Sequence, residues 1–152
     1  MPTINLSAVN TIPTVRTGTG TMSSTGKVVT GTGTAFLSEI KIGFKLFNGV
    51  ELKTVTKVFS DTSIEIDSAF GVALSGSAVS YLNLGDQKLM SFSIAPSGAG
   101  VEMNGVEIPA DIGVNLRISD VDRSVGRKYL KNPVIDPSTE TAYVVYELWG
   151  DF

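Results

Sequence analysis

Short alternating runs of hydrophobic and polar residues recur along this chain, the pattern of β-strands that bury one face. Residues 63–67 read Ser-Ile-Glu-Ile-Asp, which places Ile64 and Ile66 on the buried face of a strand. Residues 88–94 and 113–121 give two further strand-like runs. Glycine, threonine, serine and valine are frequent, and they favour short strands joined by tight turns. We therefore expect an all-β fold.

Two Asn-Gly dipeptides, Asn48-Gly49 and Asn104-Gly105, lie between strand-like runs. Asn and Gly both accept the positive φ values that the two central residues of a type I′ turn require. The sequence therefore predicts a type I′ β-hairpin at each dipeptide.

One short helix is predicted after the second copy of a repeated pentapeptide. The sequence Thr-Gly-Thr-Gly-Thr occurs twice, ending at Thr21 and at Thr34, and two copies are too few for a repeat architecture. Thr34 is a suitable N-cap residue and Gly43 a suitable terminator. Phe36 and Ile40, four residues apart, would share one helix face. We expect this helix to plug a small barrel.

The first 17 residues form a segment whose only charged residue is Arg16. Its apolar residues include Ile4, Leu6 and Ile12, and the segment is predicted to be an extended N-terminal arm. Two interpretations are open: the arm is the first strand of the chain's own sheet, or it adds a strand to a neighbouring subunit. In the second case these three side chains are candidate interface residues.

Near the C-terminus, residues 142–149 form a strand-like run that is apolar on both faces. Such a strand is either central in its own sheet or covered by a partner, and we favour the central position. Tyr143 and Trp149 are candidate interface residues, because aromatic anchors are enriched at the centres of protein interfaces.

The basic residues of the chain concentrate between residues 123 and 131. Arg123, Arg127 and Lys128 precede Tyr129 there. A solvated loop or helical turn is the default interpretation. The alternative is an electrostatic contact with an acidic neighbour or, less favoured, with packaged DNA, so these four residues are further candidates for an interface.

Composition narrows the class of protein. With 42% hydrophobic and 18% charged residues among 152, the chain is expected to fold. A net charge of -3 gives no general attraction for nucleic acid, so bulk nucleic acid is not an expected partner. No apolar run is long enough to span a membrane, and the first 15 residues do not resemble a signal peptide. The lack of cysteine fits synthesis in a reducing cytoplasm.

Catalytic chemistry finds no obvious support in the sequence. With neither His nor Cys, the chain has no Ser-His-Asp or Cys-His pair and none of the usual zinc ligands. The glycine-rich stretches lack the spacing of phosphate-binding loops. A calcium-like loop beginning at Asp120 has Val125 in place of the required glycine and Lys131 in place of the bidentate glutamate. We expect no enzyme activity, no cofactor and no metal.

A family resemblance is carried by the order and spacing of several short pieces. These are Gly-Thr-Gly-Thr-Ala-Phe at residues 31–36, Gly43, Asn48-Gly49, and Val-Phe-Ser-Asp-Thr-Ser-Ile at residues 58–64 with Phe70. Residues 18–70 thereby resemble a small β module that recurs in structural proteins of tailed bacteriophages. In that module an acidic residue usually follows the glycine that matches Gly43, whereas this chain has Phe44, so an apolar contact is expected to replace a turn carboxylate. The resemblance implies a location in the virion.

The expected organisation has three parts. Residues 1–17 form the arm, residues 18–84 a small β-barrel or SH3-like module with one short helix, and residues 85–152 a second antiparallel β unit packed with it. The last two are either separate or one continuous domain. The expected function is that of a non-enzymatic virion structural protein, a capsid decoration, collar or tail subunit. Its partners would be copies of itself and other virion proteins. The alternative is a module that binds glycans or a host surface.

Overall fold

The computed structural model describes residues 3–6, 8–96, 101–108, 114–117, 129–137 and 142–148. It confirms the all-β class, because these residues form antiparallel strands and one short helix. The chain divides into two compact units, one made of Val15–Leu84 and the other of Met1–Thr14 together with Gly85–Phe152. Residues 1–14 of the expected arm therefore belong to the same unit as residues 85–152, whereas its residues 15–17 belong to the other unit.

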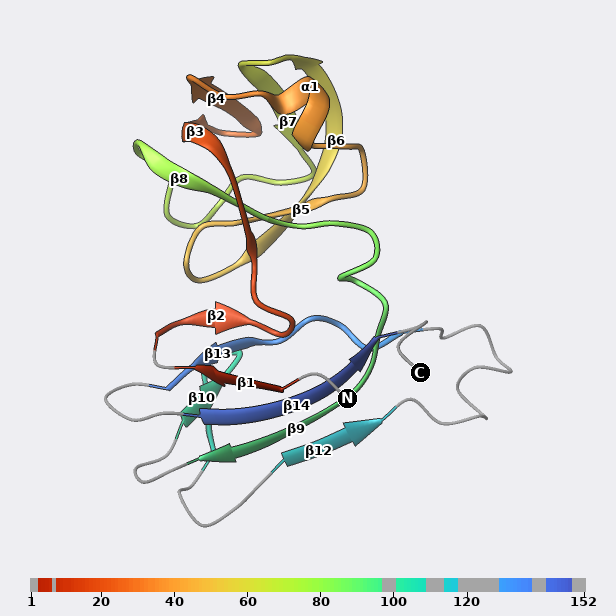
Figure 1. The fold of residues 1–152 in the computed structure, drawn as a ribbon. Coiled ribbons are helices and arrows are strands. Elements are labelled where there is room, and N and C mark those ends of the chain that lie inside the picture. The colour runs from red at the N-terminus through yellow and green to blue at the C-terminus, as the bar shows by residue number, and fades with distance from the viewer. Residues whose placement is uncertain are drawn as a thin grey trace. The chain divides into compact units, whose positions relative to one another are not determined.

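The unit Val15–Leu84 is a closed barrel with the strand order β3-β4-β7-β6-β5-β8 (Figure 1). Its strands are β3 (Arg16–Thr25), β4 (Val28–Thr32), β5 (Lys45–Phe47), β6 (Leu52–Ser60), β7 (Ser63–Ile66) and β8 (Ser77–Leu82). Every pair of neighbouring strands is antiparallel. Closure pairs both sides of each strand, so the barrel offers no sheet edge to another chain. The likeness to an SH3 fold stays a prediction.

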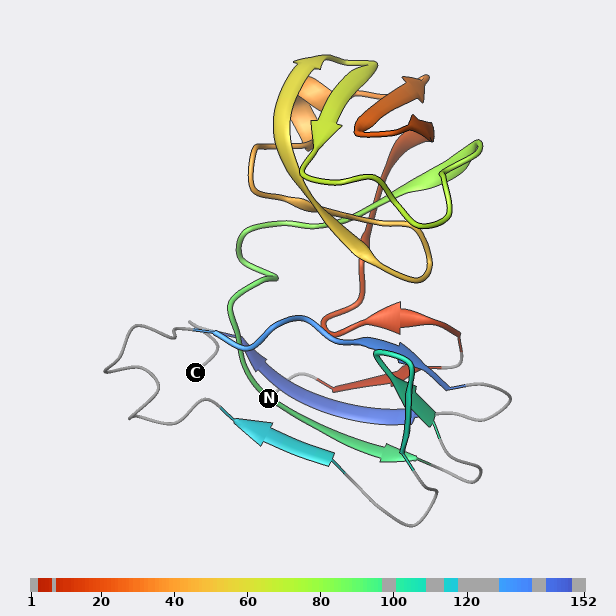
Figure 2. The ribbon, with the colours of Figure 1, turned by 180° about the vertical axis from the view of Figure 1, so that it is seen from behind.

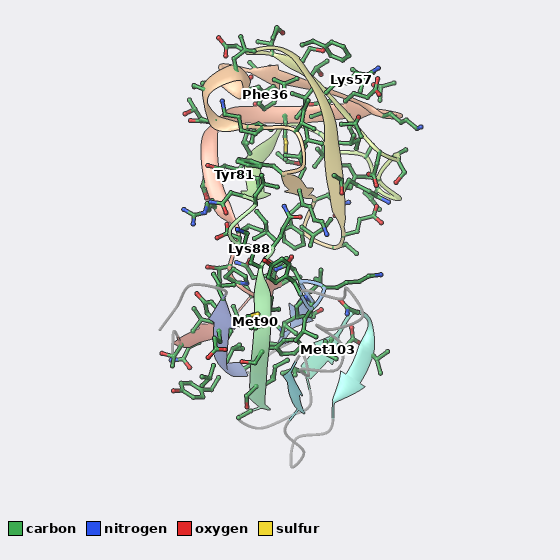
Figure 3. The ribbon with its side chains drawn as sticks, turned by 90° about the vertical axis from the view of Figure 1, so that its right-hand side faces the viewer. Phe36, Lys57, Tyr81, Lys88, Met90 and Met103 are labelled. Atoms are coloured by element: carbon green, nitrogen blue, oxygen red, sulfur yellow. The ribbon has the colours of Figure 1, made fainter. Side chains whose placement is uncertain are left out.

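The barrel interior holds one hydrophobic cluster of buried side chains. Its members are Met22, Val29, Phe36, Ile40, Leu46, Val55, Ile64, Ile66, Phe70, Leu74 and Val79. Ile64 and Ile66 are fully buried, as the alternation predicted. Figure 3 shows Phe36 directed into the barrel and Lys57 on its outside. Each fully buried side chain of this size stabilises the fold by about 1.5–3 kcal/mol, so the barrel has a core of its own.

The helix α1 (Phe36–Glu39) is shorter than predicted and is capped differently. Its N-cap residue is Ala35, which makes no side-chain capping hydrogen bond. The hydroxyl of Thr34 instead donates to the backbone oxygen of Asp61. The Asp61 side chain accepts the N–H of Leu37 at 3.1 Å and so serves the first turn of the helix. The capping carboxylate therefore comes from the turn between β6 and β7.

Gly43 lies beyond the end of the helix and forms a turn. Its φ is 93°, a value that favours glycine, and its N–H donates to the oxygen of Val55 at 2.9 Å. The next residue, Phe44, stacks on Tyr81 with ring centroids 5.8 Å apart. The apolar contact expected at this position is therefore an aromatic stack.

The two Asn-Gly hairpins form with different turns. In the first, residues 48–51 make a four-residue loop between β5 and β6, and the φ of Gly49 is positive whereas that of Asn48 is not. The Asn48 side-chain oxygen accepts the N–H groups of Val50 at 2.9 Å and Glu51 at 2.8 Å. The predicted type I′ turn is therefore wrong here, because the φ of Asn48 is not positive. The Asn48 side chain caps the loop beside a backbone hydrogen bond, in which the Asn48 N–H donates to the oxygen of Glu51 at 3.3 Å.

The second hairpin has the predicted two-residue turn. It joins β10 (Val101–Met103) and β11 (Val106–Ile108), and Met103 pairs with Val106 across it. The φ values are 51° at Asn104 and 81° at Gly105, both positive as a type I′ turn requires.

The second unit contains two four-stranded sheets. The first has the order β1-β14-β9-β12 and the second β11-β10-β13-β2. The remaining strands are β1 (Thr3–Leu6), β2 (Asn10–Thr11), β9 (Leu89–Pro96), β12 (Val114–Arg117), β13 (Val134–Asp136) and β14 (Ala142–Leu148). In Figures 1 and 2 the strands β2 and β13 lie on one side of β14 and β9. β14 is central in its sheet, as the apolar character of both its faces indicated.

The two sheets of this unit share one hydrophobic core. It combines buried side chains of both sheets and of the segments beside them, namely Leu6, Ile12, Leu89, Phe92, Ile94, Val101, Ile135, Ala142 and Val144. Met103 packs against this cluster from β10.

The N-terminal segment is not a free arm. β1 pairs antiparallel with β14, and β2 pairs antiparallel with β13. Of the two interpretations that the sequence left open, the structure has the first strand of the chain's own sheet. The reason lies in Leu6 and Ile12, whose side chains are 4% and 0% exposed, because they fill the core between the sheets.

A buried asparagine fixes the end of this segment. Asn132 is 8% exposed, and its amide nitrogen donates to the backbone oxygen of Ile12 at 2.9 Å and to that of Asp86 at 3.0 Å. The N–H of Ile12 in turn donates to the oxygen of Pro133 at 3.2 Å. Three segments distant in sequence are therefore held together by hydrogen bonds that leave no buried backbone group of Ile12 unpaired.

Candidate functional site

The polar side chains of the described residues mainly make hydrogen bonds that hold the fold together. Within those residues no three acidic side chains gather as a metal ion would require. No buried side-chain nitrogen or oxygen in the same ranges lacks a hydrogen-bond partner. None of the described helices has the length and apolar character needed to cross a membrane. A candidate site among the described residues therefore lies on an exposed surface.

The first Thr-Gly-Thr-Gly-Thr copy forms an irregularity in β3. The pairing of β3 with β8 shifts register between Thr17 and Thr21, and Thr19 there donates two hydrogen bonds to the carboxylate of Glu39. Gly18 leaves room for that carboxylate, since an added Cβ would lie 2.8 Å from its oxygen. The hydrogen bonds from Thr19, first that of the hydroxyl and then that of the N–H, lower the pKa of Glu39. This copy of the repeat thus anchors α1 to the barrel wall.

The second copy positions Thr34. A Cβ on Gly31 would collide with the Thr34 side chain, and the buried Thr34 hydroxyl needs that space to reach the oxygen of Asp61. Gly33 has a φ of 65°, which an L side chain rarely adopts. Both copies are explained by close approaches and turns, without a ligand.

Three of the sequence-predicted interface residues lie in or beside the core. Leu6 and Ile12 are buried, and Ile4 is half-buried and packs against the same cluster. The structure corrects their assignment to an interface between subunits. Alternation in the sequence identified a buried face but did not say which sheet buries it. These side chains pack against the core of their own chain.

The other predicted interface residues fall into two groups. Arg123, Arg127, Lys128 and Trp149 lie outside the described residues. Tyr129 is half-buried and precedes Leu130, whose N–H donates to the oxygen of Leu89 at 2.7 Å. Tyr143 alone of the described candidates is largely exposed, at 46%.

Tyr143 lies on the outer face of the first sheet. The strand register places Asn5 of β1 on one side of it and Ala95 of β9 on the other. Both neighbours are exposed and small. Val145 follows on the same face, paired with Ser93. Among its described neighbours in the strand register, the Tyr143 ring is thus flanked by short side chains.

The most exposed apolar side chains of the barrel are two valines that the sequence analysis did not single out. Val72 is 71% exposed and Val50 is 68% exposed. They belong to the loops 48–51 and 71–73, which we call the barrel tip. The two loops touch, because the Asn48 side-chain nitrogen donates to the oxygen of Val72 at 3.1 Å.

Hydrogen bonds hold the barrel tip in place from several sides. The N–H of Gly71 donates to the Glu51 carboxylate, whose other oxygen lies 3.7 Å from the Lys53 ammonium group. Just beyond the tip, the N–H of Leu74 donates to the hydroxyl of Ser24 at 2.8 Å. The loop conformation that exposes the valines is therefore fixed before any partner binds.

One weak sequence signal marks the tip. Between Asp67 and Asp86 no residue is charged, and this long uncharged stretch includes the second loop of the tip. An uncharged stretch is equally typical of a buried segment, and Leu74 within it is indeed buried. Hydropathy alone cannot separate the exposed valine from the buried leucine.

The comparisons with known proteins add no name to these surfaces. The chain matches no protein-family model, and no curated protein and no solved structure is significantly similar to it.

Proposed function

We propose that this chain is a non-enzymatic structural protein of a tailed-bacteriophage virion, made in the cytoplasm of the bacterial host. In this proposal it is a capsid decoration, collar or tail subunit that acts through contacts with copies of itself and with other virion proteins. The observation that carries the proposal is the barrel tip, where Val50 and Val72 are held in water by a hydrogen-bonded pair of loops.

The geometry of the tip supports a contact with protein. Exposed apolar side chains lower the free energy only when a partner covers them. A loop already fixed by Asn48 and Glu51 loses little conformational entropy on binding. Apolar side chains on a rigid support are therefore suited to an interface.

The small size of the tip supports an assembled particle over a free complex. Two valines and their loops cover much less than the roughly 800 Å² per partner of a standard stable interface. A weak contact gains strength when many copies are held on one particle, because each further contact becomes intramolecular. The phage-like pieces of sequence lie in the same barrel, at residues 31–36 and 58–64, and they favour a virion as that particle.

The direct test is the composition of particles. Virions of the phage that encodes this chain would be purified by density gradient and digested, and the peptides of this chain quantified against those of the major capsid protein. We expect a fixed stoichiometry through successive gradients. Recovery of the chain only from the unbound fraction would overturn the proposal.

Paired variants test whether the tip makes the contact. We expect the double variant Val50→Ser with Val72→Ser to melt like wild type, because both side chains are exposed. Its incorporation should fall about tenfold or more, since burying a valine contributes about 1.5 kcal/mol and about 1.4 kcal/mol is a factor of ten. The matched control is Val28→Ser, a 41% exposed valine on the barrel wall. Equal loss in both would show that the tip has no special role.

A second candidate function is favoured by one observation, the exposed ring of Tyr143. Sugars bind to shallow surfaces where an aromatic ring is flanked by short polar groups, and Asn5 lies beside this ring in the strand register. A glycan array probed with wild type, Tyr143→Ala and Tyr143→Phe tests it. Binding that the alanine variant loses and the phenylalanine variant keeps would support a glycan site. If wild type binds no glycan on the array, this candidate is excluded.

A further inference from the structure

Four strands lie at sheet edges in the second unit, and β1 differs from the other three. The edges are β1 and β12 in the first sheet and β11 and β2 in the second. β12 contains Arg117, β11 contains Glu107, and β2 has only two residues. Charge and shortness are common protections against pairing with another chain. β1, with the sequence Thr-Ile-Asn-Leu, carries neither charge nor proline.

One side of β1 is available for pairing. In an antiparallel ladder, alternate residues direct their N–H and C=O groups to the strand on either side. β1 has β14 on one side, and among the described residues no strand lies on the other. The outward backbone groups of β1 therefore form a short template for a further strand.

We propose that this edge pairs antiparallel with β1 of a second copy of the chain about a two-fold axis. The two first sheets then join into one continuous sheet across the axis. This inference deepens the proposed function and rests on it, because it names one of the subunit contacts and the partner that makes it.

The two faces of the sheet restrict the register. Ile4 pairs with Val144 and faces the core, whereas Asn5 pairs with the exposed Tyr143 and faces outward. Residues directly opposite each other in an antiparallel pair project to the same face. The two-fold axis must therefore lie midway between a residue and the same residue of the other copy. An axis level with the peptide bond between Ile4 and Asn5 would set a core-facing side chain opposite an outward one.

The axis can be centred on Ile4 or on Asn5, and Asn5 gives the better strand pairing. Centred there, Ile4 of each copy lies opposite Leu6 of the other on the inner face, and the two Asn5 side chains lie opposite each other on the outer face. Centred on Ile4, the strand would set Pro2 opposite Leu6, and proline has no N–H to donate to the ladder. An identical strand is the matching occupant, because the same alternation then meets itself.

Disulfide trapping tests the register, because the chain contains no cysteine of its own. In Asn5→Cys the two thiols of a dimer would lie directly opposite, where the Cα separation of about 4.5–5.5 Å allows a disulfide. We expect mild oxidation of the full chain to yield a covalent dimer. In Thr3→Cys the two thiols would lie on opposite sides of the axis, about four residues apart along the ladder, and should not crosslink. Thr30→Cys on the barrel reports random collision. Crosslinking of Asn5→Cys no faster than Thr30→Cys would overturn the pairing.

A charge variant tests the same edge without oxidation. Asn5→Lys places two like charges opposite each other, yet leaves the monomer core unchanged because Asn5 is exposed. Native mass spectrometry across a concentration series should show a dimer for wild type, a dissociation constant raised at least tenfold for Asn5→Lys, and no change for Thr30→Lys. Wild type that stays monomeric throughout the series overturns the inference.

These measurements use the free chain and so separate the inference from the proposed function. A chain that is monomeric and uncrosslinked, yet present in virions at fixed stoichiometry, would remove the edge pairing and keep the function. A chain that dimerises through Asn5 but is missing from virions would remove the function and keep the pairing.

Discussion

Glu39 accepts both hydrogen bonds that Thr19 donates, the backbone N–H at 2.9 Å and the hydroxyl at 2.5 Å. The two residues connect α1 with the register shift in β3. Because both bonds favour the ionised carboxylate, the pKa of Glu39 lies below its ordinary value of 4.5. The contact is therefore sensitive to pH.

The first prediction concerns this carboxylate. A lowered pKa in the folded state stabilises the fold above the unfolded pKa, and the contribution is lost as the pH falls through the folded pKa. We expect Glu39→Gln to lower the melting temperature of the barrel near pH 7, and the gap to wild type to narrow as the pH falls below 4.5. Thermal denaturation between pH 3 and 7 measures it.

The control for this prediction is Glu65→Gln, which removes another negative charge from the barrel. The Glu65 carboxylate lies 3.9 Å from the ammonium group of Lys57 in a partly exposed pair, and such pairs contribute little. A gap between wild type and Glu39→Gln that is the same at every pH would contradict the role given to the carboxylate.

The second prediction concerns Gly20, whose φ is 78° and whose added Cβ would meet the backbone of Thr32 and Gly33. Left-handed strain of about 1–2 kcal/mol and crowding of about 1–3 kcal/mol should together destabilise Gly20→Ala by about 2–5 kcal/mol. Gly71→Ala is the control, because its Cβ would meet only the Glu51 carboxylate at 3.5 Å. Urea denaturation compares the two, and equal midpoints would disprove the close approach.

The third prediction separates backbone strain from crowding. Gly49 and Gly105 have φ values of 97° and 81°, and nothing lies within 4 Å of an added Cβ at either. Gly49→Val and Gly105→Val should each destabilise by about 1–3 kcal/mol through the backbone alone. Hydrogen exchange should locate the loss in the barrel for the first variant and in the second unit for the other. Unchanged protection in both would show that these turns tolerate a β-branched residue.

The local parts of the fold could be predicted from the sequence. Ile64 and Ile66 were identified as buried by alternation, and Asn104-Gly105 by the turn that the dipeptide favours, because both signals lie within a few residues. The pairing of β1 with β14 could not be predicted, since periodicity indicates a strand but does not name its partner. The carboxylate that caps α1 was missed for the same reason, because Asp61 lies 24 residues from Leu37.

The candidate surface was harder to predict than the fold. Val50 and Val72 have the hydropathy of core residues, and hydrogen bonds between distant loops are what hold them outward. Sequence reasoning chose Leu6 and Ile12 as interface residues because they lie in an uncharged segment, yet the core of the second unit buries them. Tyr143 was identified as a candidate, and its exposure follows from a strand that is covered on one face.

The fourth prediction concerns Asn132, whose amide serves the backbone oxygens of Ile12 and Asp86. Asn132→Leu would remove the donor that these two backbone oxygens share, and a buried polar group left unsatisfied costs about 1–3 kcal/mol. We expect a clear loss of stability in the second unit with the barrel unchanged. The exposed neighbour Lys131→Leu is the control. Equal hydrogen-exchange protection in wild type and Asn132→Leu would mean that water replaces the amide.

The last prediction concerns removal of residues 2–14. This deletion takes away β1 and β2 and uncovers a core to which Leu6 and Ile12 contribute two buried side chains. Burial of each is worth about 1.5–3 kcal/mol before the lost strand pairing is added, so the second unit should melt far below wild type even in dilute solution. The barrel should keep its protection from hydrogen exchange, because all its strands lie within Val15–Leu84. Leu6→Ala, with an expected loss of about 2–5 kcal/mol, separates lost packing from lost pairing. A truncated chain that melts like wild type when dilute, but fails to associate, would show that the N-terminal segment makes a contact between subunits.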